Sequence, residues 1–412
     1  MERDLRKPAG EALAKDLTAQ ESIPEAGIER AVELMRSGRL FRYPETGGTA
    51  DDVAMLEQDF AKALGRKYCV AMNSCGSTLF VALKCAGVGP GSRVLMNSFT
   101  LAPVPGAIDN ACGEPVLVDM TENYGIDLDD LARKARSSAS KLLLLSHMRG
   151  HIADMEQVAS LCGELGLTLI EDCAHTMGAS WDGRPTGTFG AIGCFSTQSY
   201  KHLNSGEGGL LVTDDADIAA KAILYSGSYM LYEQHLARPP SEVFDRWKGM
   251  IPNCSLRMSS IAAAVLRPQI PLLAQRVRRW NERYSWLEGA LRAIRDLQVP
   301  VRETREQFVG SSLQFSIPRL GSAAIRTFLK RCQDRGVHLK WFGNPEPVGF
   351  TSVARHWKYV RDDNQTPNAD TILKTTFDMR VPLVLDRNDC DLIVRIIEEA
   401  LEHALAAQTT AA

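Results

Sequence analysis

Short apolar segments alternate with amphipathic segments through the middle of the chain. Several intervening stretches repeat apolar residues at helical spacing, such as the one from residue 155 to residue 165. Continuous apolar strands separated by helices are typical of a mostly parallel sheet that helices cover on both faces, so the pattern predicts an α/β fold. The apolar runs that predict strands span residues 68–72, 93–96, 114–119, 141–147, 167–173, 192–197 and 209–213.

The pattern changes at both ends of this region. Residues 1–48 suggest an N-terminal arm with a short helix, and residues 49–258 form the expected large domain. From residue 259 a long helical stretch leads into a smaller α+β region, where apolar runs at 338–342 and 380–385 predict strands. We therefore expect a third segment, residues 259–412, that carries the long helix and a small C-terminal domain.

The charge balance narrows the possible partners. The 412 residues include 47 lysines and arginines against 50 aspartates and glutamates, a formal net charge of −3. A generic nucleic-acid binder needs an excess of cations, so we expect no nucleic-acid partner. No run of 18 apolar residues and no apolar export signal occur, so we expect a cytoplasmic protein without a membrane partner.

Cysteine and histidine spacing gives no sign of a metal site. The ten cysteines are scattered and form no CxxC pair, which is typical of reduced thiols. His147 and His151 lie four residues apart, but Gly150 between them argues against a helical ligand pair. We therefore expect no metal.

Three polar residues stand at the carboxyl ends of predicted strands: His147, Asp172 and Ser196. These ends meet at one edge of a parallel sheet, where ligands bind in open α/β folds. Each residue alone could be a plain strand cap. Their coincidence indicates a site at this edge.

A lysine follows the same edge in the segment CFSTQSYKHLNSGEGG, residues 194–209. Lys201 comes shortly after Ser196 and 201 − 172 = 29 residues after Asp172, and glycines 206, 208 and 209 are expected to let the backbone approach a ligand. A desolvated lysine amine forms a Schiff base with an aldehyde, and an aspartate keeps a pyridine nitrogen protonated. The pair predicts pyridoxal 5′-phosphate (PLP) as cofactor, with Lys201 and Asp172 as catalytic residues.

The segment NSCGST, residues 73–78, offers an anion site between a strand and a helix. Backbone N–H groups at a helix N-terminus, together with hydroxyl donors, suit a phosphate. The same residues could be ordinary helix caps. The segment supports PLP because it occurs in order with Asp172, Ser196 and Lys201.

These segments together resemble the DegT-type sugar aminotransferases, which are fold-type-I PLP enzymes. The resemblance runs from about residue 31 to residue 400, and CFSTQSYKHLNSGEGGLLVT, similar to the family's lysine motif, is its most specific part. GRKYCVAMNSCGSTLFVAL resembles the phosphate-binding strand, loop and helix, and IEDCAHTMGA resembles the aspartate motif. The resemblance implies a fold-type-I large domain with a mostly parallel mixed sheet and a smaller C-terminal α+β domain.

The resemblance also implies roles for single residues. Lys201 would form the Schiff base and carry the proton, Asp172 would hold the pyridinium nitrogen, and His175 would contact the cofactor's phenolic oxygen. Ser196, with Gly76 and Ser77, would hold the phosphate. Arg257, in the segment SLRMSS, matches the arginine of a further family motif. In this family the partner subunit completes the cofactor pocket, so the resemblance implies a homodimer with shared active sites.

The sequence departs from the family pattern at three places. Leu101 stands where an aromatic residue usually stacks on the pyridine ring, and Ser255 where an asparagine often binds the neighbour's phosphate. Ser-Cys-Gly replaces the usual Ser-Gly-Thr of the phosphate loop. Two segments, residues 41–43 and 341–350, could contact the substrate. They could equally be ordinary packed residues and a solvent-exposed loop without a role in binding.

The function that follows is transfer of an amino group from an amino-acid donor, glutamate or glutamine. The acceptor would be a carbonyl group of a sugar, a sugar nucleotide or a sugar-like intermediate.

Leu101 and Ser255 motivate a second hypothesis, PLP-dependent elimination or substitution on the same fold. A third is a non-catalytic PLP-binding sensor, against which the intact Lys201 and Asp172 argue. A dinucleotide-binding domain is disfavoured because no GxGxxG motif joins a first strand to a helix.

Overall fold

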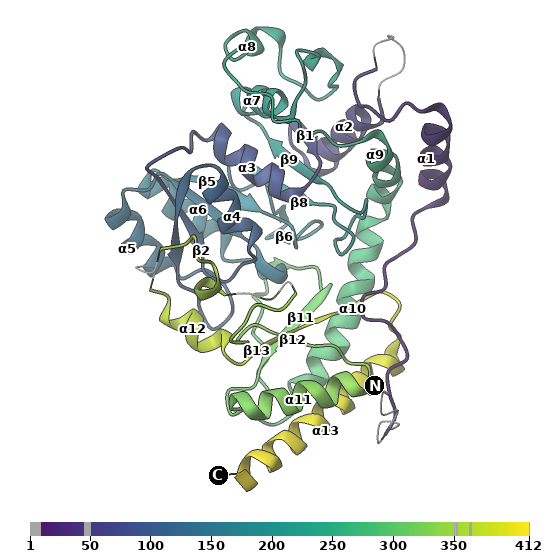
Figure 1. Cartoon of the computed structure of the whole chain (residues 1–412), viewed down its shortest axis with the longest axis vertical. Helices are drawn as coiled ribbons and strands as arrows, with labels where there is room; N and C mark the ends of the chain where they lie inside the picture. Colours follow the sequence, from purple (N-terminus) through teal and green to yellow (C-terminus); the bar gives the residue numbers. More distant parts are fainter. Residues whose placement is uncertain (1–9, 45–50, 350, 352, 362–364, 412) are drawn as a thin grey trace, which may run out of the picture.

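The computed structural model describes residues 10–44, 51–349, 351, 353–361 and 365–411, and a seven-stranded sheet forms its centre (Figure 1). The strands of this sheet are β1 (Tyr68–Met72), β2 (Ser92–Asn97), β3 (Gly113–Val118), β4 (Leu142–Ser146), β5 (Thr168–Asp172), β8 (Ile192–Ser196) and β9 (Gly209–Thr213). Their order is β1-β9-β8-β5-β4-β2-β3, and only β9 runs antiparallel to its neighbours. The predicted mostly parallel mixed sheet is confirmed.

Helices cover both faces of this sheet, which is why its strands are continuous apolar runs. The helices of this part are α2 (Asp52–Leu64), α3 (Cys75–Cys85), α4 (Pro103–Asn110), α5 (Leu128–Ser138), α6 (Met155–Leu165), α7 (Ala216–Ser226) and α8 (Ser241–Asp245). Apolar side chains of α3, α4 and α7 pack with one face, and those of α5 and α6 pack with the other.

Prolines interrupt the long helical stretch predicted from residue 259. The stretch consists of α9 (Ser260–Leu266), a 3-10 turn (Arg267–Leu272) and α10 (Leu273–Leu291). Pro268 and Pro271 lie in the turn, where the missing N–H groups prevent a continuous helix. α10 then leads from the large sheet to the C-terminal part (Figure 1).

The C-terminal part is a three-stranded antiparallel sheet with three helices, of which the first and the last pack against its apolar face. Its strands are β11 (Ser312–Ser316), β12 (Lys340–Trp341) and β13 (Thr376–Arg380), in the order β11-β13-β12, and its helices are α11 (Ser322–Asp334), α12 (Pro367–Leu373) and α13 (Arg387–Ala411). The strand predicted at 380–385 is wrong, because the strand ends at Arg380, just before Pro382, which has no N–H for a ladder. Strand β11 was not predicted.

Small elements connect the two parts of the chain. A minor sheet pairs β6 (Ser180–Trp181) with β7 (Arg184–Pro185) and with β10 (Glu306–Gln307). The N-terminal segment buries Leu13 and Leu17 in the core of the C-terminal part and then leads to α1 (Glu25–Ser37). The domain boundaries at residues 48 and 258 remain predictions.

All ten cysteines are free thiols. Among the helices of the described ranges, none combines the length and the hydropathy that a membrane span requires.

Candidate active site

A cavity of about 360 Å³ lies where the carboxyl ends of β4, β5 and β8 meet the start of α3, and we call it the sheet-edge cavity. Six of the predicted site residues line it: Gly76, Leu101, Asp172, His175, Ser196 and Lys201. Ser77 lies beside them on the first turn of α3, where its hydroxyl donates to Asn73 Oδ1 at 2.6 Å. The fold thus brings together side chains that are up to 201 − 76 = 125 positions apart in the sequence.

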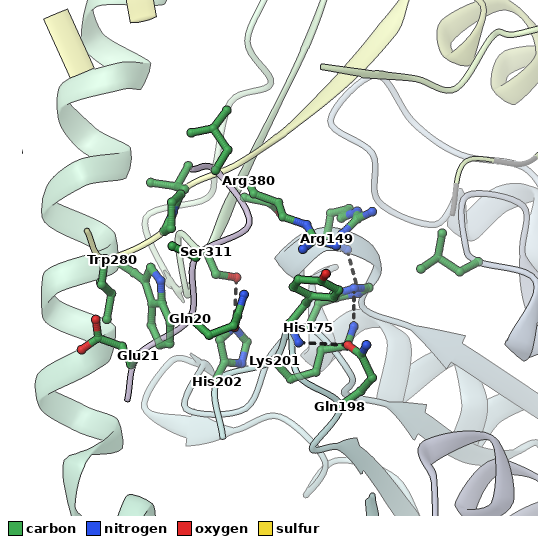
Figure 2. A pocket seen from close by; sticks show the side chains of 18 residues that line it. Gln20, Glu21, Arg149, His175, Gln198, Lys201, His202, Trp280, Ser311 and Arg380 are labelled. Carbon is green, nitrogen blue, oxygen red and sulfur yellow. Dashed lines mark hydrogen bonds between the residues drawn. The ribbon is translucent and has the colours of Figure 1, made fainter. Parts of the chain in front are cut away.

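Lys201 is the amine in this cavity, and its surroundings change its basicity strongly. Its Nζ lies 2.7 Å from Nε2 of His175 (Figure 2). Burial, and next the positive charge of Arg149, lower the pKa of Lys201 to about 7, although Asp172 opposes the shift. A substantial share of this amine is therefore neutral near pH 7, and a neutral amine is a nucleophile and a base.

The hydrogen bonds of His175 fix which of its nitrogens carries the proton. Nδ1 accepts from the backbone N–H of Arg149 at 3.3 Å, so the proton of the neutral ring belongs on Nε2. Burial and the nearby charge of Lys201 hold the pKa of His175 well below its usual value. Nε2–H can therefore donate to the neutral amine of Lys201 and hold it in place.

Asp172 is the last residue of β5, at the base of the cavity, and each of its two carboxylate oxygens accepts a hydrogen bond. Its Oδ2 accepts from the Ser146 hydroxyl at 2.7 Å, and its Oδ1 accepts from the Ala174 N–H at 3.1 Å. Ser146 is paired with Asp172 in the β4–β5 ladder, so the sheet register itself places this partner. Asp172 is buried yet lines the cavity, so its carboxylate is available to a ligand there.

The start of α3 offers an anion cradle. Ser74 caps the helix by accepting from the Ser77 N–H at 3.0 Å, and a Cβ at Gly76 would meet only Ser74 Oγ, at 3.7 Å. The predicted role of the SGEGG glycines needs a correction, because a Cβ on Gly209 would collide with the backbone of Ser74. Gly209 brings β9 against this cradle rather than against a ligand.

A second, smaller cavity of about 100 Å³ adjoins the first, and we call it the arginine cavity. The two share Leu101, His175, Gln198 and Lys201. Arg149 and Arg380 line only the second one and lie close together in Figure 2. Sequence reasoning missed both arginines, although the alternation in TFDMR, residues 376–380, could have placed Arg380 on the polar face of a strand.

Arg257 lies apart from both cavities. Its Nη1 donates to the Gly227 carbonyl at 2.9 Å, and its guanidinium lies over the rings of Phe41 and Tyr229. Ser255, two residues earlier, has a φ of 55°, a left-handed conformation that asparagine adopts more readily than serine.

Two further predictions concern ring stacking and substrate contact. Leu101 lines the sheet-edge cavity, and among the described lining residues His175 is the only aromatic one. Arg42 and Tyr43, considered as substrate-facing, are instead buried against Glu57 and His235. For these two residues the packing interpretation holds.

One group of potential metal ligands occurs in the described part of the chain: His147, Glu171 and Cys173. All three are buried, and Glu171 already accepts from His147 Nε2 and from the N–H groups of Gly187, Phe189 and Gly190. Burial opposes its ionisation, but these hydrogen bonds outweigh burial and lower the pKa of Glu171. Glu171 therefore holds the turn at residues 187–190 in place. These hydrogen bonds explain why its carboxylate is buried here, and no metal is needed for that.

Known proteins resemble the chain over most of its length. It is 30% identical to the 3-amino-5-hydroxybenzoate synthase of Amycolatopsis mediterranei (strain S699) over 84% of this chain and 86% of that protein. It is also 30% identical to a pleiotropic regulatory protein of Geobacillus stearothermophilus over 94% and 98% of the two chains. The match to the spore coat polysaccharide biosynthesis protein SpsC of Bacillus subtilis (strain 168) is 33% identical and spans about half of each protein, 48% and 50%.

Solved structures share the fold. The crystal structure of 3-amino-5-hydroxybenzoic acid synthase superposes with a TM-score of 0.80 at 24% identity, covering 93% of this chain and 98% of that one. DesV of S. venezuelae gives a TM-score of 0.76 at 21% identity, over 91% and 94% of the two chains.

The DegT/DnrJ/EryC1/StrS aminotransferase family matches residues 22–398, a range that contains both cavities apart from a few residues at the edge of the second. The resemblance found in the sequence motifs is thereby confirmed. The chain belongs to the DegT/DnrJ/EryC1/StrS aminotransferase family.

Proposed function

We propose that the protein is a PLP-dependent aminotransferase that moves nitrogen from glutamate or glutamine to the carbonyl group of a sugar, a sugar nucleotide or a sugar-like intermediate. The observation that carries the proposal is Lys201, a buried lysine with its pKa lowered to about 7 at the junction of two cavities. A relative named L-glutamine:scyllo-inosose aminotransferase, from Streptomyces griseus, is 35% identical over about half of each protein and supports this donor and a cyclic acceptor.

The sheet-edge cavity fits PLP. Gly76 and the first turn of α3 would hold the phosphate with Ser77, and Ser196 lines the same cavity. Asp172 would hold the proton on the pyridine nitrogen, supported by Ser146. When bound, PLP supplies an aldehyde for the Lys201 amine and a ring that withdraws electrons from the bond being broken.

The chain's own residues would then bind the reactants and move a proton. Nζ of Lys201 would remove the proton from the donor α-carbon, which carries the transferred nitrogen, and would deliver it to the C4′ carbon of the cofactor, acting first as general base and then as general acid. Nε2–H of His175 would hold this amine in position between proton transfers. A pKa near 7 suits both roles, because the amine can lose and gain a proton near neutral pH.

Elimination or substitution is the second candidate, because Leu101 leaves the cofactor ring without the usual aromatic partner on the described lining. A sensor without turnover is disfavoured, although one relative bears a regulatory name, because such a protein needs no lysine with a lowered pKa. Both alternatives predict that amino acids do not aminate the cofactor.

The test uses the purified holoenzyme. Borohydride reduction and peptide mapping should place the pyridoxyl mass on the peptide with Ser199, Tyr200 and Lys201. Mixing the holoenzyme with single amino acids should convert the cofactor absorbance to that of its aminated form with glutamate or glutamine, and Lys201→Ala should abolish this conversion. Label on another lysine, or no conversion with any amino acid, would refute the proposal.

We also propose that two chains pair to complete each site, as the match of Arg257 implies. Arg257 lines neither cavity of its own chain, and the rings that it contacts, Phe41 and Tyr229, are exposed, as are Met230 and Leu231, which follow Tyr229 in the sequence. Exposed apolar side chains gathered around a cation are a reasonable contact for a second copy.

A mixing experiment tests the shared site. Lys201→Ala and Arg257→Ala should each be nearly inactive alone. Refolded together, they should form heterodimers in which one site carries both defects and the other carries neither, so part of the activity returns. If both variants fold and exchange subunits but the mixture stays inactive, Arg257 acts within its own subunit.

A further inference from the structure

The arginine cavity carries more positive charge than the residues around it neutralise. Arg149 and Arg380 line it, and Lys340 lies beside Arg149 at a shared carboxylate. Oδ2 of Asp378 is 3.1 Å from Nη2 of Arg149 and 3.1 Å from Nζ of Lys340. Glu21 also lines the cavity, but it is paired with Arg279 at 2.8 Å. Three cations therefore share one carboxylate.

The register of the small sheet explains why these groups gather. Asp378 and Arg380 are two positions apart on β13, so they lie on the same face of the sheet. Lys340 and Gln314 are the cross-strand partners of Asp378 on the two neighbouring strands. Gln314 Nε2 donates to Asp378 Oδ1 at 2.8 Å, so Asp378 is fully used by Arg149, Lys340 and Gln314. Within the described ranges Arg380 forms no ion pair.

Both arginines keep a buried N–H without a protein partner. Nε of Arg149 and Nη1 of Arg380 have no hydrogen-bond partner in the described ranges. The guanidinium of Arg380 lies 3.4 Å from the ring centroid of Tyr200, the residue before Lys201. Burial, together with the charge of Arg149, lowers the pKa of Arg380, so its charged form is incompletely solvated.

The backbone of Arg149 also favours a functional role. Its φ of 54° and ψ of 24° are left-handed, which costs a residue with a Cβ about 1 kcal/mol. The conformation is fixed by the hydrogen bond from its N–H to His175 Nδ1. Strain of this kind is typical of ligand-binding positions. Here it directs a guanidinium into the cavity that Lys201 also lines.

We propose that Arg149 and Arg380 bind a carboxylate of the carbonyl acceptor, so that the acceptor is an acid rather than a neutral sugar. This proposal rests on the aminotransferase function proposed above. Donor and acceptor must reach Lys201 in turn, so both enter the same cavity. The donor brings its α-carboxylate, whereas a neutral acceptor would leave the partly buried Arg380 without a counter-ion and one N–H group of each arginine without an acceptor, at a large cost in affinity.

The geometry favours a carboxylate over a diphosphate. A guanidinium presents a planar fork of donors that matches the oxygens of a carboxylate or of a phosphate, so the size of the cavity decides between the two. The arginine cavity, at about 100 Å³, has room for a carboxylate near Lys201 but not for a diphosphate with its nucleoside.

The experiment compares two nearly isosteric probes, 4-oxocyclohexane-1-carboxylate and 4-oxocyclohexane-1-carboxamide. Holoenzyme is first aminated with glutamate or glutamine, and the return of the aldehyde absorbance is then followed with each probe. Each probe is also measured as an inhibitor of the donor reaction, which reports binding without turnover. Wild-type enzyme should prefer the acid by about 10- to 100-fold, the range for hydrogen bonds to a charged group.

Variants then assign the preference to the cavity. Arg380→Gln should bring the rates of acid and amide close together by slowing the acid, and Arg380→Lys should restore part of the difference. Arg326→Gln, an exposed arginine on α11 of the same C-terminal part, is the matched control and should behave as wild type.

Each contrary outcome has a clear meaning. If the acid neither reacts faster nor inhibits more strongly than the amide with the wild-type enzyme, the proposal is overturned, whereas the aminotransferase function still stands. This result needs no variant. If Arg380→Gln loses only the reaction with the donor, the arginine binds the donor rather than the acceptor. That result also overturns the proposal. Inhibition by UDP that Arg380→Gln abolishes, without acid preference, points to a nucleotide-linked acceptor instead. Failure of the amination step with every amino acid overturns both proposals.

Discussion

Arg42 and Arg149 are both buried arginines paired with a buried carboxylate, but only Arg149 opens onto a cavity. Arg42 donates both Nη groups to Glu57, which also accepts from His235 Nδ1 and the Ala71 N–H. We call Arg42, Tyr43, Glu57 and His235 the Glu57 cluster. We call Arg149, Lys340, Asp378 and Arg380 the Asp378 cluster.

The two clusters differ above all in charge balance, and the side chains of Lys340 and Arg380 are also less buried than those of the Glu57 cluster. The Glu57 cluster pairs one cation with one anion, and burial together with the charge of Arg42 keeps the pKa of its His235 low, so the histidine is neutral. The Asp378 cluster has three cations for one anion. Each cluster leaves one or more guanidinium N–H groups unpaired, so an unpaired donor alone does not mark a site. A charge excess that faces a cavity does.

Asp172 provides the sharpest functional contrast with Glu57. Asp172→Asn keeps both hydrogen bonds within reach but removes the charge that, in the proposed function, keeps the cofactor's ring nitrogen protonated. We expect kcat/KM to fall by about 10³-fold, the scale for a lost electrostatic group, with a much smaller loss of PLP affinity. Steady-state kinetics and PLP titration measure the two. Ser146→Ala, which keeps the charge, should lose far less, and equal activity in Asp172→Asn would make Asp172 a mere strand cap.

Glu57→Gln should show the opposite behaviour. The change leaves Arg42 as a buried cation without its counter-ion, which destabilises a protein by about 3 kcal/mol. Denaturant unfolding should report this loss, while kcat/KM of the folded enzyme stays near wild type. A variant as stable as wild type, or one that is stable but inactive, would remove the distinction between the clusters.

The same variant should change the response to acid. Burial raises the pKa of Glu57, but Arg42 and His235 more than compensate and lower it to about 2, below its ordinary value of 4.5. The stability that Glu57 contributes is therefore complete above the ordinary pKa and is lost as the pH falls from there towards 2. Unfolding free energy measured against pH should fall less steeply in this range for Glu57→Gln than for wild type.

The sequence was sufficient for the large sheet and for most residues at its edge. Strands buried on both faces are continuous apolar runs, and Asp172, Ser196 and Lys201 follow two of them directly, so their meeting is a consequence of parallel topology. No sequence signal marks Arg149, and the alternation in residues 376–380 could place Arg380 only on the polar face of a strand, not at the site. Arg149 depends on a left-handed turn, and Arg380 depends on the pairing of β13 with strands far away in the sequence.

Misplaced elements have equally specific causes. The apolar run after Arg380 predicted a strand there, but Pro382 ends the ladder and moves the strand to Thr376–Arg380. The sequence suggested Arg42 and Tyr43 as residues that contact the substrate. It could not show that both already form hydrogen bonds inside the protein, with Glu57 and His235. Partners that lie about 190 positions away are invisible without the fold, as for Tyr43 and His235 at a separation of 192.

Arg149 should also influence Lys201 through its charge. The pKa of Lys201, about 7, lies far below the ordinary 10.5, and Arg149 is the first cause after burial. In the proposed function the neutral amine captures PLP, so the rate of capture by apoenzyme should rise with pH and level off above about 7. Arg149→Gln should move this midpoint upward by about one unit. Stopped-flow absorbance at a series of pH values measures it, and Arg326→Gln should leave the midpoint unchanged.

The smallest expected effect belongs to Tyr43, at the edge of the Glu57 cluster. Its hydroxyl donates to His235 Nε2 at 2.8 Å while His235 Nδ1 donates to Glu57, so the tyrosine fixes the tautomer of a neutral histidine. Tyr43→Phe leaves one buried ring nitrogen without a partner and should cost about 1 kcal/mol of unfolding free energy. Tyr359→Phe, whose exposed hydroxyl donates to the Ala102 carbonyl at 3.3 Å, is the matched control and should cost less. Because no residue of the Glu57 cluster lines the sheet-edge cavity or the arginine cavity, kcat/KM should stay at the wild-type level in both variants. A fall in kcat/KM without loss of stability in Tyr43→Phe would mean that this cluster, too, belongs to the active site.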